Sequence, residues 1–157
     1  MPAGIATKAL KRVEIMNGLT EEQMDQIAAF CHAKVFQAGE VIVRRSEPTD
    51  ELYIIESGSA EVDLSGNGGP ISPQNPAAPQ ALISLGQGQV FGEMALVDTG
   101  LRSATVRCSS NDTRVLVIRR SDLIGLCERN TDIGYQVMRN LAADISFKLR
   151  HRNLSWR

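Results

Sequence analysis

The feature that most constrains this 157-residue chain is a series of short β-like segments between residues 34 and 119. Branched aliphatic residues are concentrated in these segments, and glycine-containing turns at 38–39, 57–58 and 86–88 separate them. The segments are EVIVRR (40–45), ELYIIES (51–57), SAEVDL (59–64), ALISL (81–85), SATVRC (103–108) and RVLVIR (114–119). Short strands at such regular spacing predict an antiparallel β jelly roll or barrel.

Helical patterns precede the β-like segments. Thr20 and Gln23 have the spacing of a helix capping box. Apolar residues follow on one helical face, at Met24, Ile27, Ala28 and Cys31. The preceding ALKRVEIM (9–16) is a second candidate helix, so we expect N-terminal helices within residues 5–32, with His32 inside the last of them.

Two further helices are predicted after the β-like region. Ser121, followed by Asp122, caps a short helix, and Asn130 or Thr131 starts a longer one. The longer helix carries an apolar stripe at Val137, Met138, Leu141, Ala142, Ile145 and Leu149. This stripe can cover the β-roll, a second copy of the chain, or both.

Composition favours one domain. The chain is 43% hydrophobic and 22% charged, with a formal net charge of −1, so it can bury one core and has no global field for nucleic acid or anionic membranes. The fold class expected is α+β, with helices at 5–32, a β-roll at 34–119 and helices at 121–152 forming a single domain over 1–157.

The three cysteines are far apart and lack a CxxC spacing, which favours a reducing, cytoplasmic location without a disulfide framework.

Between two of the β-like segments lies SGNGGPISPQNPAAPQA, residues Ser65–Ala81. Its glycines and prolines disfavour both helix and central strand. We expect an exposed hairpin loop there and assign it no functional role.

The segment FGEMALVDTGLRSATV, residues Phe91–Val106, carries two charges among apolar residues. Gly92 permits a tight entry into a short helix, whose amide N–H groups favour an anion, and Arg102 can direct its guanidinium at the same anion. Glu93 suits a sugar hydroxyl better than a phosphate, and a phosphate beside a sugar indicates a nucleotide. Alternatively, Glu93 and Arg102 form a salt bridge with each other.

This segment resembles the phosphate-binding cassette of the cyclic nucleotide-binding domain family, whose pattern is F-G-E-(L/M)-A-L followed by R-(A/S/T)-A-(T/S)-V. The stretches FQAGEVIVRRSEPTDELYIIESGSAEV, LGQGQVFGE and NGLTEEQMDQIA are similar to other parts of the same family, so the resemblance covers roughly residues 13–149. It implies the jelly-roll form of the fold. Two departures are Leu101, where many members have proline, and the insertion at Ser65–Ala81.

The resemblance implies a role for each matching residue of the cassette, Phe91–Val106. Gly92 and Ala95 would offer N–H groups to the cyclic phosphate, with Met94 between Glu93 and Ala95 in the same turn, and Glu93 would accept a hydrogen bond from the ribose 2′-hydroxyl. Arg102 would neutralise the phosphate. The remaining implied ligand-binding residues are Ser103 beside Arg102 and, for the base, Val62, Leu82 and Leu85.

The implied function is a cytoplasmic sensor that binds cAMP or cGMP, needs no cofactor or metal, and transmits the signal by helix rearrangement. A ligand-independent protein-interaction module on the same fold is the alternative, with a homodimer or protein partner on the C-terminal helix in either case. An enzyme is not expected, because His32 and His151 are the only histidines and give neither a cupin-like metal site nor a Ser-His-Asp arrangement. Direct DNA binding is not expected either, because no helix-turn-helix follows before Trp156-Arg157.

Overall fold

The computed structural model describes residues 3–48, 50–63, 82–97, 100–102 and 104–155. The predicted loop at Ser65–Ala81 and the candidate residue Ser103 therefore lie outside the described residues. The chain divides into a helical unit, residues 1–32 with 118–157, and a β unit, residues 33–117. The predicted α+β class and antiparallel jelly roll are confirmed.

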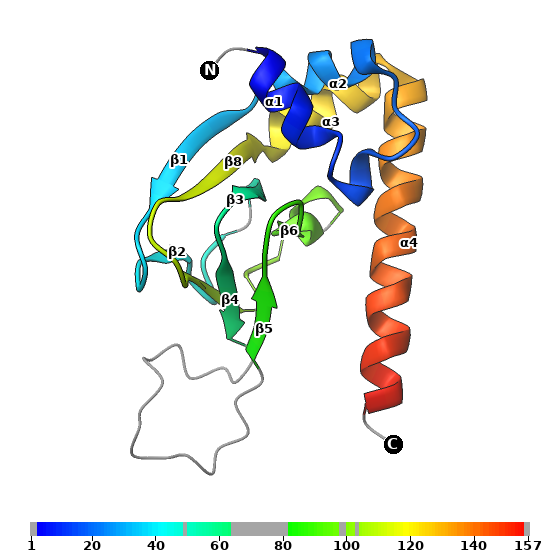
Figure 1. The fold of residues 1–157 in the computed structure, drawn as a ribbon. Coiled ribbons are helices and arrows are strands. Elements are labelled where there is room, and N and C mark those ends of the chain that lie inside the picture. The colour runs from blue at the N-terminus through cyan, green and yellow to red at the C-terminus, as the bar shows by residue number, and fades with distance from the viewer. Residues whose placement is uncertain (1–2, 49, 64–81, 98–99, 103, 156–157) are drawn as a thin grey trace, which may run out of the picture. The chain divides into compact units, whose positions relative to one another are not determined.

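The β unit contains two four-stranded sheets (Figure 1). Their orders are β1-β8-β3-β6 and β2-β7-β4-β5. The strands are β1 (His32–Phe36), β2 (Val41–Val43), β3 (Glu51–Ser57), β4 (Ala60–Asp63), β5 (Leu82–Leu85), β6 (Val90–Phe91), β7 (Thr105–Cys108) and β8 (Thr113–Arg119). Each of the six β-like segments of the sequence thus contains one strand. In β3 and β8 four consecutive apolar residues are buried, as is typical of a strand that is covered on both faces.

The register of β4 organises the second sheet. In antiparallel pairing, Val62 lies opposite Ile83 of β5 and opposite Val106 of β7. Ala60 is fully buried, and Val62 is half-buried and packs against the core of the roll. The buried core residues are Val43, Tyr53, Ile55, Ala60, Leu85, Phe91, Val106, Val115 and Val117.

The predicted end of the N-terminal helices at His32 is wrong. The α2 helix (Glu21–Ala28) ends at Ala28, and His32 begins strand β1, which is a neighbour of β8 in its sheet. Val35 and Phe36 favour strand, and pairing with β8 satisfies the backbone of this segment. Helical periodicity could not locate this boundary, because a short apolar run fits either structure.

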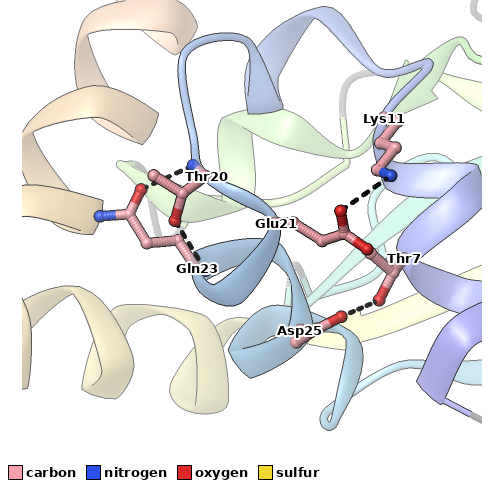
Figure 2. Close-up of polar contacts among 6 residues, drawn as sticks. All are labelled: Thr7, Lys11, Thr20, Glu21, Gln23 and Asp25. Carbon is pink, nitrogen blue, oxygen red and sulfur yellow. Dashed lines mark hydrogen bonds and ion pairs between the residues drawn. The ribbon is translucent and has the colours of Figure 1, made fainter.

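The capping box that the sequence predicts at the start of α2 is confirmed. The Thr20 hydroxyl accepts a hydrogen bond from the Gln23 N–H at 3.1 Å, and the Thr20 N–H donates to Gln23 Oε1 at 2.9 Å (Figure 2). The segment before α2 differs from the predicted helix at 9–16, since α1 (Ala3–Leu10) ends early and a separate 3₁₀ turn, η1 (Glu14–Met16), follows. Two side-chain contacts, from Thr7 to Asp25 at 2.5 Å and from Lys11 to Glu21 at 3.4 Å, link α1 and the residue after it to α2 (Figure 2).

The two C-terminal helices are α3 (Arg120–Arg129) and α4 (Thr131–Ser155). The predicted cap at Ser121 is wrong, because β8 runs directly into α3 and the N-cap is Arg119. The backbone of Arg119 is extended, and its side chain makes no capping hydrogen bond. Asp122 instead lies in the first turn, where a carboxylate favours the helix. The predicted start of the longer helix at Asn130 or Thr131 is confirmed, since α4 begins at Thr131 and the Asn130 side chain just before it accepts a hydrogen bond from the Ile133 N–H at 3.3 Å.

The apolar stripe of α4 is covered in only part of its length. Val137 and Leu141 are buried, whereas Leu149 and the neighbouring Phe147 are exposed. Within the helical unit, the N-terminal half of α4 lies against η1 and α3, and its C-terminal half extends beyond them (Figure 1). Among the described residues, no helix combines the length and the apolar character needed to cross a membrane.

Candidate functional site

The candidate site begins where β6 ends, at Gly92. Its backbone is in the left-handed region, with φ of 78°, which a residue with a side chain adopts only at a cost. Space is also restricted, because a Cβ added to Gly92 would lie 2.6 Å from Arg102 Nη1 and 2.9 Å from the Glu51 carbonyl oxygen. Both the turn and the close approach therefore require glycine, and they bring the backbone of Gly92 against the Arg102 side chain.

The short helix that the sequence predicts after Gly92 is present as the 3₁₀ helix η2, Glu93–Leu96. The Ala95 N–H donates to the Gly92 carbonyl at 3.0 Å, which is the i to i+3 pattern expected of a single tight turn. Ala95 is buried, Glu93 is half-buried and Met94 is exposed. The buried Ala95 thus fixes the η2 turn in the protein, and Glu93 is the first residue of that turn.

Arg102 is held by both its backbone and its side chain. Its N–H donates to the Glu47 carbonyl at 2.8 Å, and its own carbonyl accepts from the Ser46 N–H at 2.9 Å. The side chain donates from Nη2 to the Glu51 carbonyl at 3.0 Å, and Cζ lies 5.5 Å from the centroid of the Tyr53 ring. Only 9% of Arg102 is exposed, so these contacts offset part of the cost of removing a cation from water.

Tyr53 forms the next layer beneath Arg102. Its ring stacks on Phe91 with centroids 4.9 Å apart and an interplanar angle of 5°, and its hydroxyl donates to Glu51 Oε1 at 3.1 Å. Burial, followed by the nearby Glu51 carboxylate, raises the pKa of the Tyr53 hydroxyl well above its ordinary value, so it remains a neutral donor. Sequence reasoning missed Tyr53 and Glu51, because only the β3–β6 register, which pairs Tyr53 with Phe91, brings them to the site.

The residues predicted to contact a base lie on β4 and β5. Val62 is half-buried and packs against the core that contains Leu85, Phe91 and Tyr53, so the apolar wall and the start of the cassette share one core. Only the backbone of Leu82 is described, and its partner in the register is Asp63.

The register also identifies a residue that sequence reasoning missed. Ile83, rather than Leu82, is the β5 residue opposite Val62, and 49% of Ile83 is exposed. Because directly opposite residues share one face of an antiparallel pair, Ile83 extends the apolar face of Val62. A strict alternation count from the buried Leu85 would have selected Ile83.

Comparison with known proteins identifies the family. Residues 33–130 match the family described as the cyclic nucleotide-binding domain. The cAMP-dependent protein kinase regulatory subunit of Schizosaccharomyces pombe is 32% identical over 101 residues, which are 64% of this chain and 22% of that protein. The cyclic AMP receptor protein of Thermus thermophilus is 28% identical over 145 residues, which are 92% of this chain and 61% of that protein.

A solved structure supports the same relationship. The crystal structure of the Thermus thermophilus catabolite activator protein matches with a TM-score of 0.74 and 28% identity, over 91% of this chain and 61% of that chain. The chain therefore spans between 22% and 61% of the length of these relatives.

Proposed function

This chain belongs to the cyclic nucleotide-binding domain family, and on that premise we propose that it binds cAMP or cGMP at the cassette and acts as a regulatory sensor. The observation that carries the proposal is the approach of Arg102 to Gly92. A buried guanidinium lies so close to a bare stretch of backbone that a single added Cβ would meet it at 2.6 Å. A fixed cation beside accessible backbone is an arrangement suited to a phosphate ester.

The cassette residues take distinct roles in this proposal. Arg102 neutralises the cyclic phosphate, and the N–H groups of Gly92 and Ala95 donate to its oxygens, with Ala95 sharing or exchanging its present bond to the Gly92 carbonyl. Glu93 accepts a hydrogen bond from the ribose 2′-hydroxyl, which a carboxylate can do without a second donor. Met94 completes the turn, and Ser103 adds a hydroxyl beside Arg102.

The purine base occupies the apolar side of the site. Val62 and Ile83 offer adjacent apolar side chains on β4 and β5, Leu85 supports them from the core, and Leu82 stands next to Ile83 in the same strand. An apolar wall beside a small number of placed polar groups is the usual composition of a small-molecule site. Either purine satisfies this description, so the choice between cAMP and cGMP is left to measurement.

The signal in this proposal is a change in the helices. Binding orders the cassette turn, and the C-terminal helix then changes its packing partner, to the extent that the nucleotide prefers one arrangement over the other. The names of the Schizosaccharomyces pombe and Thermus thermophilus relatives, which refer to cAMP, support a regulatory role without catalysis. For the whole protein, we propose a cytoplasmic location, a homodimer or protein partner on the C-terminal helix, and no direct contact with DNA.

Calorimetry with cAMP and with cGMP tests the proposal. Wild-type protein should bind at least one of them, and Arg102→Ala should weaken that binding by roughly 30-fold or more, because it removes one partner of a buried charge pair worth about 2–5 kcal/mol. Glu93→Ala should weaken it by roughly 10- to 150-fold through the loss of a charge-assisted hydrogen bond.

A matched control separates binding from general charge effects. Arg114 pairs with Glu56 at 3.1 Å in the same β unit, and both side chains are partly exposed, so Arg114→Ala should leave the affinity unchanged. Well-folded wild-type protein that takes up neither nucleotide at millimolar concentration would refute the proposal. Equal losses of affinity in the Arg102 and Arg114 variants would show that the cassette is not the site.

The second candidate is a protein-interaction module without nucleotide control. It is favoured by one observation, the exposure of Tyr135, Phe147 and Leu149 on α4. Light scattering with and without nucleotide distinguishes the two, because only a sensor should change its assembly or shape when the nucleotide is added. Self-association that is the same with and without nucleotide would favour the protein-interaction module.

A further inference from the structure

Contacts at both the ring and the hydroxyl hold Tyr53 in place. One face of its ring stacks on Phe91, its hydroxyl donates to Glu51 Oε1, and only 6% of the residue is exposed. Its place is also set by the backbone, because Tyr53 and Phe91 are direct partners in the β3–β6 register. The ring therefore has one well-defined position in the β unit.

The Arg102 guanidinium depends on the same two residues of β3. Cζ lies 5.5 Å from the Tyr53 ring centroid, and Nη2 donates to the backbone carbonyl of Glu51 at 3.0 Å. Glu51 therefore anchors both partners, the arginine through its carbonyl and the tyrosine through its carboxylate. A long and flexible side chain is thereby confined by contacts within the protein.

Confinement of this kind affects binding. A flexible arginine must lose rotamer freedom when it meets a phosphate, and that loss weakens the affinity. If the guanidinium is already ordered by an aromatic ring and a carbonyl, the loss occurs during folding and no longer weakens binding. The ring is a suitable support, because its face attracts the cation without neutralising the charge that the phosphate requires.

From this arrangement we infer that Tyr53, seated on Phe91 and tied to Glu51, is a positioning residue that fixes Arg102 in the orientation in which it meets the phosphate. Phe91 directly precedes Gly92, so the same stack also joins the support of the cation to the entry of the cassette turn. The inference rests on the proposed function, because its main readout is the affinity for a cyclic nucleotide.

Two substitutions separate the parts of this role. Tyr53→Leu keeps an apolar side chain but removes the ring face, and it should weaken binding of the preferred nucleotide, cAMP or cGMP, by about 5- to 30-fold. Tyr53→Phe keeps the ring and removes only the bond to Glu51, so it should stay within about 3-fold of the wild type.

A control variant accounts for lost stability. Val117→Ala shortens a buried residue of the same core on β8, so it should lower the melting temperature while leaving the affinity unchanged. A purely structural role for Tyr53 predicts that affinity follows the melting temperature across all three variants. A positioning role predicts that only Tyr53→Leu loses affinity, whereas Val117→Ala loses melting temperature without losing affinity.

A second measurement needs no nucleotide. The Arg102 Nε–H signal in the NMR spectrum, assigned by its loss in Arg102→Ala, should be displaced by the ring current of Tyr53 in the free wild-type protein. It should remain displaced in Tyr53→Phe and move toward the position of exposed arginines in Tyr53→Leu.

The outcomes distinguish this inference from the proposed function. If wild-type protein binds the nucleotide and Tyr53→Leu binds it equally tightly, the inference is overturned and the proposed function stands. If wild-type protein binds neither nucleotide, the proposed function fails and the NMR signal decides. A signal that is the same in wild type and Tyr53→Leu then overturns the inference, and one that shifts only in Tyr53→Leu supports Tyr53 as the support of Arg102.

Discussion

Gly92→Ala is the substitution for which the structure gives the most definite expectation. Two separate costs act at this position. A residue with a Cβ in the left-handed conformation costs about 1–2 kcal/mol, and φ at Gly92 is 78°. The new methyl group would also lie 2.6 Å from Arg102 Nη1 and 2.9 Å from the Glu51 carbonyl, and relieving such overpacking costs about 1–3 kcal/mol.

A second glycine of the β unit isolates the steric part. Gly39 has φ of 90°, but a Cβ added there would meet nothing within 4 Å. Gly39→Ala should therefore lose only about 1–2 kcal/mol, whereas Gly92→Ala should lose about 2–5 kcal/mol. The difference, about 1–3 kcal/mol, corresponds to roughly 2–12 °C in melting temperature for a chain of this size.

Urea unfolding and nucleotide calorimetry on the same samples check both consequences. Because the Glu51 carbonyl is backbone, the flexible end of Arg102 should move instead, so Gly92→Ala should also weaken the affinity while Gly39→Ala leaves it unchanged. Equal stability losses in the two variants would refute the steric reasoning. An unchanged affinity in a clearly destabilised Gly92→Ala protein would refute the link between this glycine and the position of Arg102.

Two further predictions concern the helical unit. Thr20→Ala removes the hydroxyl that accepts from the Gln23 N–H but leaves the backbone N–H that donates to Gln23, and it should lower the free energy of unfolding by about 1 kcal/mol. Thr20→Ser keeps a hydroxyl acceptor and should retain most of that stability in urea unfolding. Burial raises the pKa of the Cys31 thiol from 9.0 to about 12, so the unfolded chain ionises before the folded chain as the pH rises. The stability associated with the neutral buried thiol is therefore complete below pH 9 and is lost between pH 9.0 and about 12. The stability difference between wild type and Cys31→Ala should therefore shrink from about pH 8 to about pH 10, and a constant difference would contradict the assignment.

Local features of the fold could be predicted from the sequence because local residues determine them. Alternation in SAEVDL marks β4, and the spacing of Thr20 and Gln23 marks the start of α2, since each depends on contacts a few residues apart. The same reasoning failed where distant contacts decide. His32 belongs to β1 because β8 lies beside it, and Ser121 is not a cap because β8 continues directly into α3.

The candidate site shows the same division. Gly92, Glu93 and Arg102 could be identified because they lie within one short segment whose residue types suit a phosphate and a sugar. The choice of Ile83 over Leu82 depends on knowing which face of β5 is buried, because a shift of one residue moves a side chain to the other face of the sheet, and the β4–β5 register with the buried Leu85 supplies that knowledge. The motif therefore groups the candidate polar residues within one short segment, whereas the candidate apolar residues depend on the pairing of β4 with β5.

The residues that hold the motif in place lie outside it. Arg102 receives its carbonyl acceptor and its aromatic support from β3, whereas Gly92 follows β6, and these two strands are paired through Tyr53 and Phe91. The pairing of β3 with β6 sets the distance between the Arg102 guanidinium and the cassette turn. The geometry of the site therefore depends on the stability of that strand pair. A chain that kept both charges and lost this pairing would keep the motif and lose the arrangement that makes it suited to a phosphate.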